Sequence, residues 1–554
     1  MATADFRSIE TVPLDAPTDA MPDASPARKI AAPAKSGGKL ISPAAELAGQ
    51  LADANRQQLL ACDYDLHGLT LQELALQSQR ELLDEACHYT ASYRDVSCEQ
   101  RALSTAKKLP RLFLAGHQPE LFHPGVWLKN FVLGRMASQQ NATAINLVVD
   151  SDTIKRTSVR VPTGSIARPH LEGVLLDQPG QPIPFEQRKI IDAEMFRSFG
   201  QRVASTIAGL VPDPMIRELW PIAIDGAKHT NSLGECLAQT RHIWEGRWGC
   251  DTLEIPQSRI CSLPAFLHFT AHLLAHLPRL WEVYNSALVE YRRANHIRSQ
   301  AHPVPQLAQE GDWIEAPFWV YRDDAPRRQR LFARCQDEQI VLTDRQGWEA
   351  TLSLSAEGST ATAIEQLQAL AKSGVHMRTR ALITTMVARV LLGDLFVHGI
   401  GGAKYDQLTD QLISRFFGLA APAYMTVSGT LRLPIDYPRG SEAELRSIRQ
   451  QQRELLFHPE RFLEASNAAG WQSYLTEKQR WIESPNVPET AKRRCQSIRS
   501  ANENMQPWLA TQRGELDQAA RAVAERAKAE RILSSREFSF CLFPAEELKG
   551  FLAG

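Results

Sequence analysis

The chain lacks three features that would assign it to a well-defined class of protein. It has no charge excess, because 62 Lys and Arg face 63 Asp and Glu among 554 residues, so no overall field attracts it to nucleic acid or an anionic membrane. Charged residues interrupt every apolar run before it reaches the roughly 18–20 residues of a membrane span. Its nine cysteines form no C-x-x-C pair, as is typical of a reducing compartment. We therefore expect a cytoplasmic protein that binds neither nucleic acid nor membrane.

Several catalytic signatures are also missing. The chain has no GxxxxGK[ST] phosphate loop, no G-x-S-x-G nucleophile elbow and no H-E-x-x-H zinc motif. His268, His272 and His276 do share one face of a predicted helix. Zinc sites usually take ligands from more than one element, so we interpret these three as interfacial histidines and predict no metal site.

The first 43 residues read as a disordered leader. The first fifty residues hold twelve Ala, six Pro and a single aromatic residue, Phe6. Such a composition cannot bury enough apolar surface to offset its chain entropy.

A βαβ unit is the clearest local structure, within Arg111–Asp152. RLFLA and AINLVV are short apolar runs typical of strands buried on both faces of a parallel sheet, and helical spacing separates them. Ligands of open parallel sheets bind beyond the carboxyl ends of the strands. The turn after the first strand and the acids after the second should therefore meet at one site, formed by Gly116, His117, Gln118, His123, Asp150 and Asp152.

Two histidines in this turn are candidate catalytic residues. A helix begins near Pro124, and the free N–H groups of such a helix end favour an anion such as phosphate. His117 and His123 would contact phosphate oxygens or transfer protons, since imidazole titrates near neutrality. The alternative is that both histidines cap the turn.

Asp150 and Asp152 are the other candidate catalytic residues. Alternate residues of an extended chain lie on one side, so the two carboxylates should point together. They would hold a substrate amine or ribose hydroxyls, or bind Mg²⁺ beside nucleotide phosphates. Acidic residues after strands are also ordinary turn formers.

A glycine loop, HGIGGAKYD, precedes a second predicted helix. Gly399, Gly401, Gly402 and Lys404 are candidates for a phosphate or carboxylate cradle. The alternative is a plain tight turn between strand and helix.

The remaining sequence predicts the domain organisation. An α/β core spans 44–440, with an N-terminal helical cap and a helical insertion at about 191–300, and strands recur between Glu315 and Leu354. A charged helical hairpin spans 441–536. The tail, 537–554, begins like a strand and should return to the core.

The hairpin shows an approximate heptad seam, which predicts an antiparallel coiled coil. Its apolar positions are Ile498, Met505, Leu509, Leu516, Ala519 and Val523, interrupted by Asn502, Pro507 and Gln512. A homodimer through this hairpin is expected.

Together these motifs resemble the BshC family, the cysteine-adding enzymes of bacillithiol biosynthesis. The matching segments are AGHQPELFHPG (Ala115–Gly125), VVDSD (Val148–Asp152), YNSALVEYRRANHIRSQAHPVPQL (Tyr284–Leu307), GIGGAKYD (Gly399–Asp406) and the hairpin. The resemblance implies a Rossmann-like core of the nucleotidylyltransferase or HUP type, an adenine-nucleotide site for ATP or ADP, a coiled-coil dimer, and ligation of cysteine to a glucosamine–malate acceptor.

The chain departs from the family pattern at the proposed site. His117 replaces the first Gln of a GQQ turn, Ser151 stands where a His is usual, and no clear KMSKS-like loop is present. Two hypotheses follow. One is a divergent ligase that joins an amino acid to a small-molecule acceptor, and the other is a catalytically inactive nucleotide-binding protein whose coiled coil recruits partners.

Overall fold

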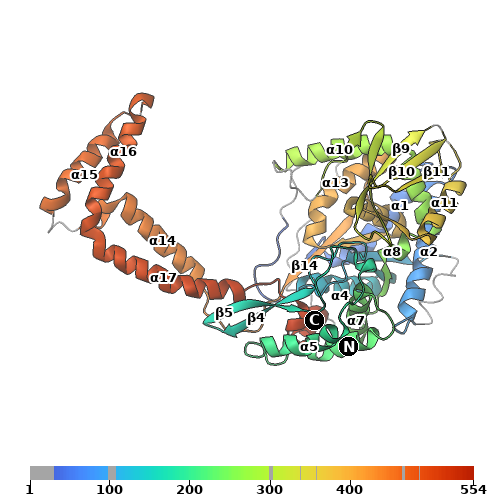
Figure 1. The fold of residues 1–554 in the computed structure, drawn as a ribbon, viewed down its shortest axis with the longest axis horizontal. Helices are drawn as coiled ribbons and strands as arrows, with labels where there is room; N and C mark the ends of the chain where they lie inside the picture. The colour runs from blue at the N-terminus through green and yellow to red at the C-terminus, as the bar shows by residue number, and fades with distance from the viewer. Residues whose placement is uncertain are drawn as a thin grey trace.

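The computed structural model describes residues 30–97, 108–297, 304–336, 338–356, 358–463, 468–485 and 487–554. It shows a globular α/β body from which a long helical arm projects (Figure 1). Most of the predicted leader lies outside the described residues. Within the described part of the chain, no helix has both the length and the apolar character needed to cross a bilayer.

A six-stranded sheet forms the centre of the body, in the order β1-β14-β13-β2-β3-β6. Five strands are mutually parallel, and β1 is antiparallel to β14 at the edge. Taken in chain order, the five parallel strands are arranged 3-2-1-4-5, the order of doubly wound nucleotide-binding folds. The strands are β1 (Gly38–Ser42), β2 (Arg111–His117), β3 (Ala142–Val148), β6 (Leu253–Pro256), β13 (Leu395–His398) and β14 (Tyr424–Thr430).

Both faces of this sheet are buried, as the continuous apolar strands predict. In β2, Leu112 and Leu114 join one hydrophobic core, while Phe113 and Ala115 join a second core on the opposite face. The first core contains α2 (Leu71–Ala91), α9 (Pro264–Ala275), α10 (Leu277–Ala294), α12 (Ala381–Val387) and α13 (Ile400–Phe417). The second contains α4 (Pro124–Gln139), α5 (Ala193–Ile207), α6 (Ile216–Gly226), α7 (Leu233–Arg247) and α18 (Ala545–Ala553).

The predicted βαβ unit is present as β2, α4 and β3. Seven residues of β2 pair in parallel with β3, from Arg111 opposite Ala142 to His117 opposite Val148. The helix starts at Pro124, where the fixed φ of proline suits the first helical position.

Two strands depart from the predicted organisation. β1 lies inside the segment expected to be a disordered leader, where the antiparallel ladder with β14 orders it. β6 lies inside the expected helical insertion and pairs with β3. Both are short strands whose partners are distant in sequence, so local periodicity could not reveal them.

A second, antiparallel sheet lies beside the first, in the order β11-β10-β9-β8-β12, with β7 paired to β8. It confirms the strands predicted between Glu315 and Leu354. The members are β7 (Gln309–Glu310), β8 (Trp313–Arg322), β9 (Gln329–Gln336), β10 (Gln339–Thr343), β11 (Glu349–Ser353) and β12 (Val375–Thr379). A separate hairpin joins β4 (Ser158–Ser165) and β5 (Arg168–Leu175), and the remaining body helices are α1 (Ala48–Leu60), α8 (Gln257–Ile260) and α11 (Ala361–Lys372).

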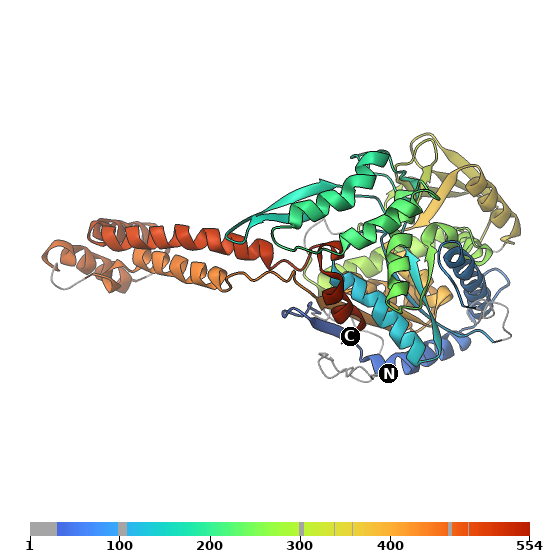
Figure 2. The ribbon, with the colours of Figure 1, turned by 90° about the horizontal axis from the view of Figure 1, so that it is seen from below.

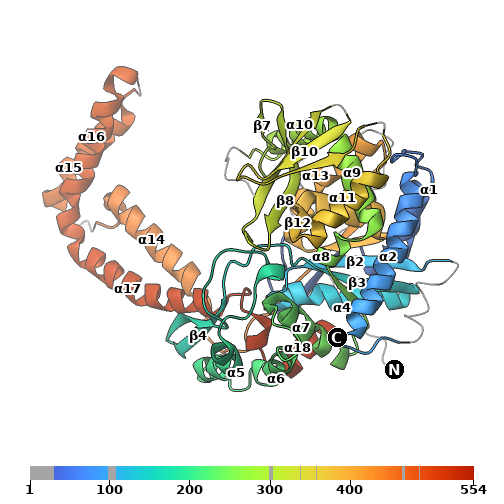
Figure 3. The same ribbon diagram turned by 45° about the vertical axis from the view of Figure 1, so that its right-hand side comes forward.

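The arm consists of helices that run out from the body and back (Figures 2 and 3). α14 packs along α17, and α15 packs along α16. Each of the two long predicted helices is divided, the second at a 3-10 turn that contains Pro507. The bounds are α14 (Ser441–Phe457), α15 (Ala468–Glu483), α16 (Pro488–Met505) and α17 (Ala510–Leu533). Coiled-coil packing in this arm stays a prediction.

The tail returns to the body, although not as a strand. Phe540–Leu542 form a 3-10 turn and α18 follows, packed on α4. The aromatic and aliphatic side chains of this segment are buried in the second core.

Candidate functional site

The strand order identifies one place where a ligand of this fold would bind. β13 pairs with β2 in parallel, with Val397 opposite Ala115. The chain leaves β2 toward α4 on one face of the sheet and leaves β13 toward α13 on the other. Their loops diverge at this topological switch point, where open parallel sheets bind ligands. The predicted residues Gly116–Gln118 and Gly399–Gly402 thus end adjacent strands, although 282 residues separate Gly399 from His117 in sequence.

The predicted glycine loop is largely helical, because α13 begins at Ile400 and places Gly401 and Gly402 in its first turn. Gly399 is the N-cap of α13 and provides no side-chain cap. A Cβ at Gly399 or Gly401 would meet no atom within 4 Å, whereas one at Gly402 would lie 2.6 Å from His398 Nδ1. None of these glycines has a positive φ. Gly399 and Gly401 therefore leave the N-terminus of α13 open, with its first N–H groups available to an anion.

His117 is buried and hydrogen-bonded through both ring nitrogens. Nδ1 lies 3.1 Å from the carbonyl oxygen of Gln118, and Nε2 lies 3.1 Å from the Asn130 amide nitrogen. Burial, together with the positive charges of Arg241 and Lys129, holds the pKa of His117 well below its usual value. The ring is therefore neutral and accepts at Nε2 from Asn130. In this arrangement it supports the turn rather than pointing at an incoming phosphate.

A buried charged network lies behind His117, and sequence reasoning missed it. Asn130 also donates to Glu245 (2.8 Å), which accepts from Arg241 at 2.5 Å. Arg241 in turn pairs with Glu254 on β6. Burial, opposed by Arg241, raises the pKa of Glu254 to about 7. The sequence signal for this network is the presence of charged residues within otherwise apolar strands and helices, because a buried charge requires a partner.

Lys129 is a second buried cation that sequence reasoning missed. Its ammonium donates to the carbonyl oxygen of Gly116 at 2.5 Å. Burial and the nearby charge of Arg241 lower its pKa to about 7. Lys129 thus fixes the backbone of the β2 turn from the α4 side.

Asp150 and Asp152 do not point together, so that expectation is wrong. The chain turns after Val148 instead of staying extended. Asp150 accepts from the backbone N–H (2.9 Å) and the hydroxyl (2.5 Å) of Ser258 on α8, beyond β6. Burial and the negative charge of Glu186 raise the pKa of Asp150 to about 7.

Asp152 instead links the ends of β2 and β3. Its carboxylate accepts from Gln118 Nε2 at 3.1 Å and from the Thr153 N–H at 2.8 Å, and pairs with Arg328 at 3.0 Å. The predicted partners Gln118 and Asp152 therefore do meet. N–H and O–H groups of the protein already donate to the carboxylates of Asp150 and Asp152. These contacts do not fit a Mg²⁺ site at the two carboxylates.

A buried ion pair connects this edge to the second sheet. Arg378 on β12 holds Glu186 through two parallel hydrogen bonds of 2.9 and 2.8 Å, and Tyr321 on β8 donates to the same carboxylate. The backbone N–H of Glu186 donates to the Asp150 carbonyl (2.9 Å). The second sheet is thereby tied to the turn after β3.

His123 contacts the tail, and Lys404 lines a cavity beside α13. His123 caps α4, accepting from the Gly125 N–H at 3.1 Å, and its Nε2 lies 3.7 Å from Glu537 in the tail. Its capping role matches the alternative raised by the sequence. Lys404 is exposed and lines a cavity of about 300 Å³ between α13, β14 and the segment after β1.

Comparison with known proteins does not identify a family. No protein-family model and no curated protein matches the chain. One match among solved structures is Plasmodium falciparum tryptophanyl-tRNA synthetase, with 9% identity and a TM-score of 0.20, covering 87% of this chain and 95% of the synthetase chain. At this level of likeness, nothing about the synthetase transfers to this chain.

Proposed function

We propose that the chain binds an adenine nucleotide, ATP or ADP, at the junction of the β2 and β13 loops. The observation that carries the proposal is the doubly wound strand order, with the open, glycine-containing N-terminus of α13 at the switch point. Gly399 and Gly401 fit a phosphate cradle, because Gly399 begins α13 without a side-chain cap, Gly401 lies in the first turn, and a Cβ at either would meet no atom within 4 Å.

We further propose a ligase-type reaction, in which an amino acid is joined to a small-molecule acceptor. The resemblance to BshC suggests cysteine as the amino acid. A bound nucleotide would supply phosphoryl or adenylyl chemistry. Gln118 and Asp152 would position the amino acid, and Lys129 would hold the Gly116 backbone beside the phosphates. Asp150, with its pKa near 7, is suited to hold or release a proton next to them.

A second candidate, an inactive nucleotide-binding protein that recruits partners, is favoured by the contacts of the histidines. Both nitrogens of His117 are engaged and His123 caps a helix. These contacts match structural roles. Turnover therefore has to be measured separately from binding.

Calorimetry of the full-length protein with ATP, ADP and AMP tests the nucleotide site. The matched variants are Gly401→Asp at the loop and Gly514→Asp on the arm, since both glycines have open space around Cβ. A carboxylate at residue 401 should weaken binding at least tenfold by repelling phosphate, about 1.4 kcal/mol, while Gly514→Asp should bind like the wild type. The absence of heat and of thermal stabilisation with all three nucleotides would overturn the proposal.

Product analysis then separates the two candidates. Protein that binds a nucleotide is incubated with that nucleotide, cysteine and glucosaminyl malate, and mass spectrometry detects the condensed product together with the cleaved nucleotide. A product made by the wild type and lost in Gly401→Asp supports the ligase. Binding without any product supports the inactive nucleotide-binding protein for this acceptor.

A further inference from the structure

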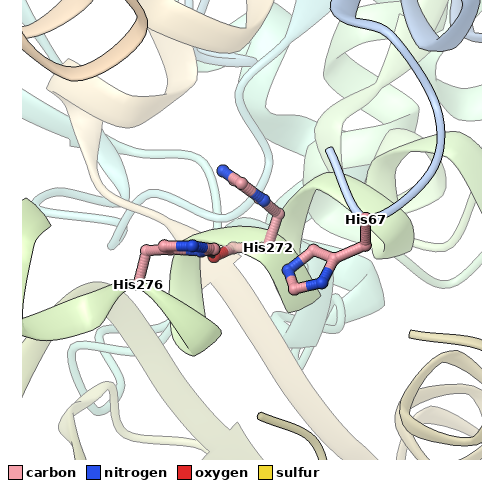
Figure 4. Close-up of side chains that lie close together, drawn as sticks. All are labelled: His67, His272 and His276. Carbon is pink, nitrogen blue, oxygen red and sulfur yellow. Dashed lines mark hydrogen bonds between the residues drawn. The ribbon is translucent and has the colours of Figure 1, made fainter. Parts of the chain in front are cut away.

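A three-histidine cluster lies away from the sheet edge, between the α1–α2 loop and the junction of α9 and α10. Figure 4 shows His67 on its loop, facing His272 and His276. One ring nitrogen from each lies within 4.8 Å of the others. Nitrogens around a tetrahedral zinc lie roughly 3.4 Å apart, since each Zn–N bond is about 2.1 Å. Ring shifts of about 1 Å would therefore close the cluster around an ion.

Each ring uses one nitrogen in a protein hydrogen bond and leaves the other available. His67 Nδ1 bonds the Gly358 carbonyl (2.9 Å), His276 Nδ1 bonds the His272 carbonyl (3.1 Å), and His272 Nε2 bonds the Tyr64 hydroxyl (3.0 Å). Among the described residues, His67 Nε2 and His272 Nδ1 are buried without a hydrogen-bond partner. Metal-binding histidines are typically oriented by such a bond at the second nitrogen.

The unpartnered His272 nitrogen is the strongest indication of a ligand, because His272 is only 1% exposed. A buried polar atom without a partner is costly in a folded protein. A metal ion bound at His272 Nδ1 would supply the partner that this buried atom lacks.

The loop conformation brings His67 to the cluster. His67 and Gly68 both have positive φ, 55° and 88°, as at the centre of a type I′ turn. The turn is closed by the Leu66 N–H, which donates to the Leu69 carbonyl (2.7 Å).

From this geometry we propose that His67, His272 and His276 form a transition-metal site, best suited to Zn²⁺, with an exchangeable fourth position. The three residues border a cavity of about 560 Å³, also lined by Tyr64, Asp65 and Ser359. Three histidines and one open position are the arrangement of zinc centres that activate a water molecule. A small polar molecule entering the cavity would reach the ion. This proposal is independent of the nucleotide site.

These three proposed ligands are not the three histidines that the sequence places on one face of a predicted helix. His268 bonds the Leu66 carbonyl through Nε2 and contacts Thr360 through Nδ1. Both of its nitrogens are occupied, so His67 replaces His268 as the third ligand. The expectation of no metal site is thereby replaced by this proposal.

Zinc titration of the full-length protein tests the site. Untagged protein is stripped with EDTA, titrated with Zn²⁺ by calorimetry, and analysed for bound zinc by mass spectrometry. We expect one Zn²⁺ per chain and a higher melting temperature with the metal. His67→Gln and His276→Gln should lose this binding, while Tyr64→Phe should weaken it about tenfold to a hundredfold.

Two control variants give the test its specificity. His170→Gln alters an exposed histidine outside the cluster and should bind like the wild type. His268→Gln should also keep stoichiometric zinc, provided its metal-free melting temperature shows that it folds. Wild-type protein without stoichiometric zinc overturns the proposal. So does zinc that survives in both His67→Gln and His276→Gln.

Cobalt substitution tests the open position. Co²⁺ in the stripped protein should give the visible absorption of a tetrahedral centre, and azide should change that spectrum by replacing the fourth ligand. A spectrum that azide leaves unchanged would overturn the exchangeable position. Retention of the Co²⁺ spectrum in His67→Gln would overturn the ligand set.

Discussion

At the scale of single residues, the surroundings of two acidic helix caps set how each responds to pH. Asp150 caps α8 through the backbone N–H of Ser258, and Asp192 caps α5 through two backbone N–H groups. Burial and Glu186 raise the pKa of Asp150 to about 7, whereas the Met195 N–H, with other hydrogen bonds, lowers that of the half-buried Asp192. The two helix caps should therefore respond to pH in opposite directions.

Replacing Asp150 with Asn tests this difference. Between pH 4 and 7 the unfolded chain loses the Asp150 proton while the folded chain keeps it, so this group's contribution to stability falls as pH rises. Asp150→Asn removes the effect, and its stability relative to the wild type should improve by up to about 4 kcal/mol from pH 4 to pH 8. Urea denaturation at both pH values measures the change.

The control is Asp192→Asn, which should show the opposite sign. A lowered carboxyl pKa adds stability as pH rises through the acid range, so the asparagine variant should lose stability relative to the wild type between about pH 2 and pH 5 and change little above that. A pH-independent difference between Asp150→Asn and the wild type would contradict the assigned pKa shift.

At the scale of elements, buried ion pairs set where the glycine loop lies. Arg389, in the π-helical turn after α12, contacts Asp406 and Asp410 of α13, each at 2.6 Å. His398 at the end of β13 lies 2.8 Å from the same Asp406 oxygen that Arg389 contacts. Burial opposes ionisation of Asp406, but His398 and Arg389 outweigh it and hold its pKa well below the usual range. Strand, loop and helix are thus held around one carboxylate.

We predict that Asp406→Asn lowers the free energy of unfolding by about 3–5 kcal/mol, because it leaves the buried Arg389 without its main counter-charge. Asp410→Asn is the matched control on the same helix. Its side chain is 33% exposed, so solvent screens the pair and the loss should be about 1 kcal/mol or less. Urea denaturation measures both, and equal losses would refute the assigned roles.

At the scale of the whole molecule, two adjacent segments of the chain connect the arm to the body. The Gly440 N–H donates to Glu530 at 2.9 Å, so the outgoing and returning ends lie together. Large apolar side chains remain exposed along the arm, namely Leu456, Phe457, Ile482, Val487 and Trp508. Asn502 and Gln512, which interrupt the predicted heptad seam, donate to the carbonyls of Phe457 and Phe462 in the same arm.

We predict that the arm dimerises the protein and that the body folds without it. Replacing residues 441–529 with a short Gly/Ser linker keeps Leu533 and the tail, which are buried in the core. Light scattering should then show a dimer for the full chain and a monomer for the arm deletion. A monomeric full chain at micromolar concentration would refute the dimer.

The matched comparison is a truncation after Asp436, which removes the tail as well as the arm. Because Phe540 and α18 belong to the second core, this truncation should fail to fold where the internal deletion folds. A folded truncation would show that the tail is dispensable.

Local patterns determined much of the fold. The apolar runs of Arg111–Val148 predicted β2, α4 and β3, and alternation predicted the second sheet. The arm was also visible as two helical stretches, although its division into shorter helices was not. These features are local because helical and strand periodicities come from residues within one turn or one pleat.

The sequence by itself determined several local motifs, and tertiary structure decided which of them meet. The GHQ turn and the glycine loop were both identifiable, but only the pairing of β2 with β13 makes them neighbours. Asp150 and Asp152 were expected to act together, and packing on α8 separates them. The three-histidine cluster needed His67 from a distant loop. Such contacts depend on strand order and chain reversal over long sequence separations, which local propensity does not encode.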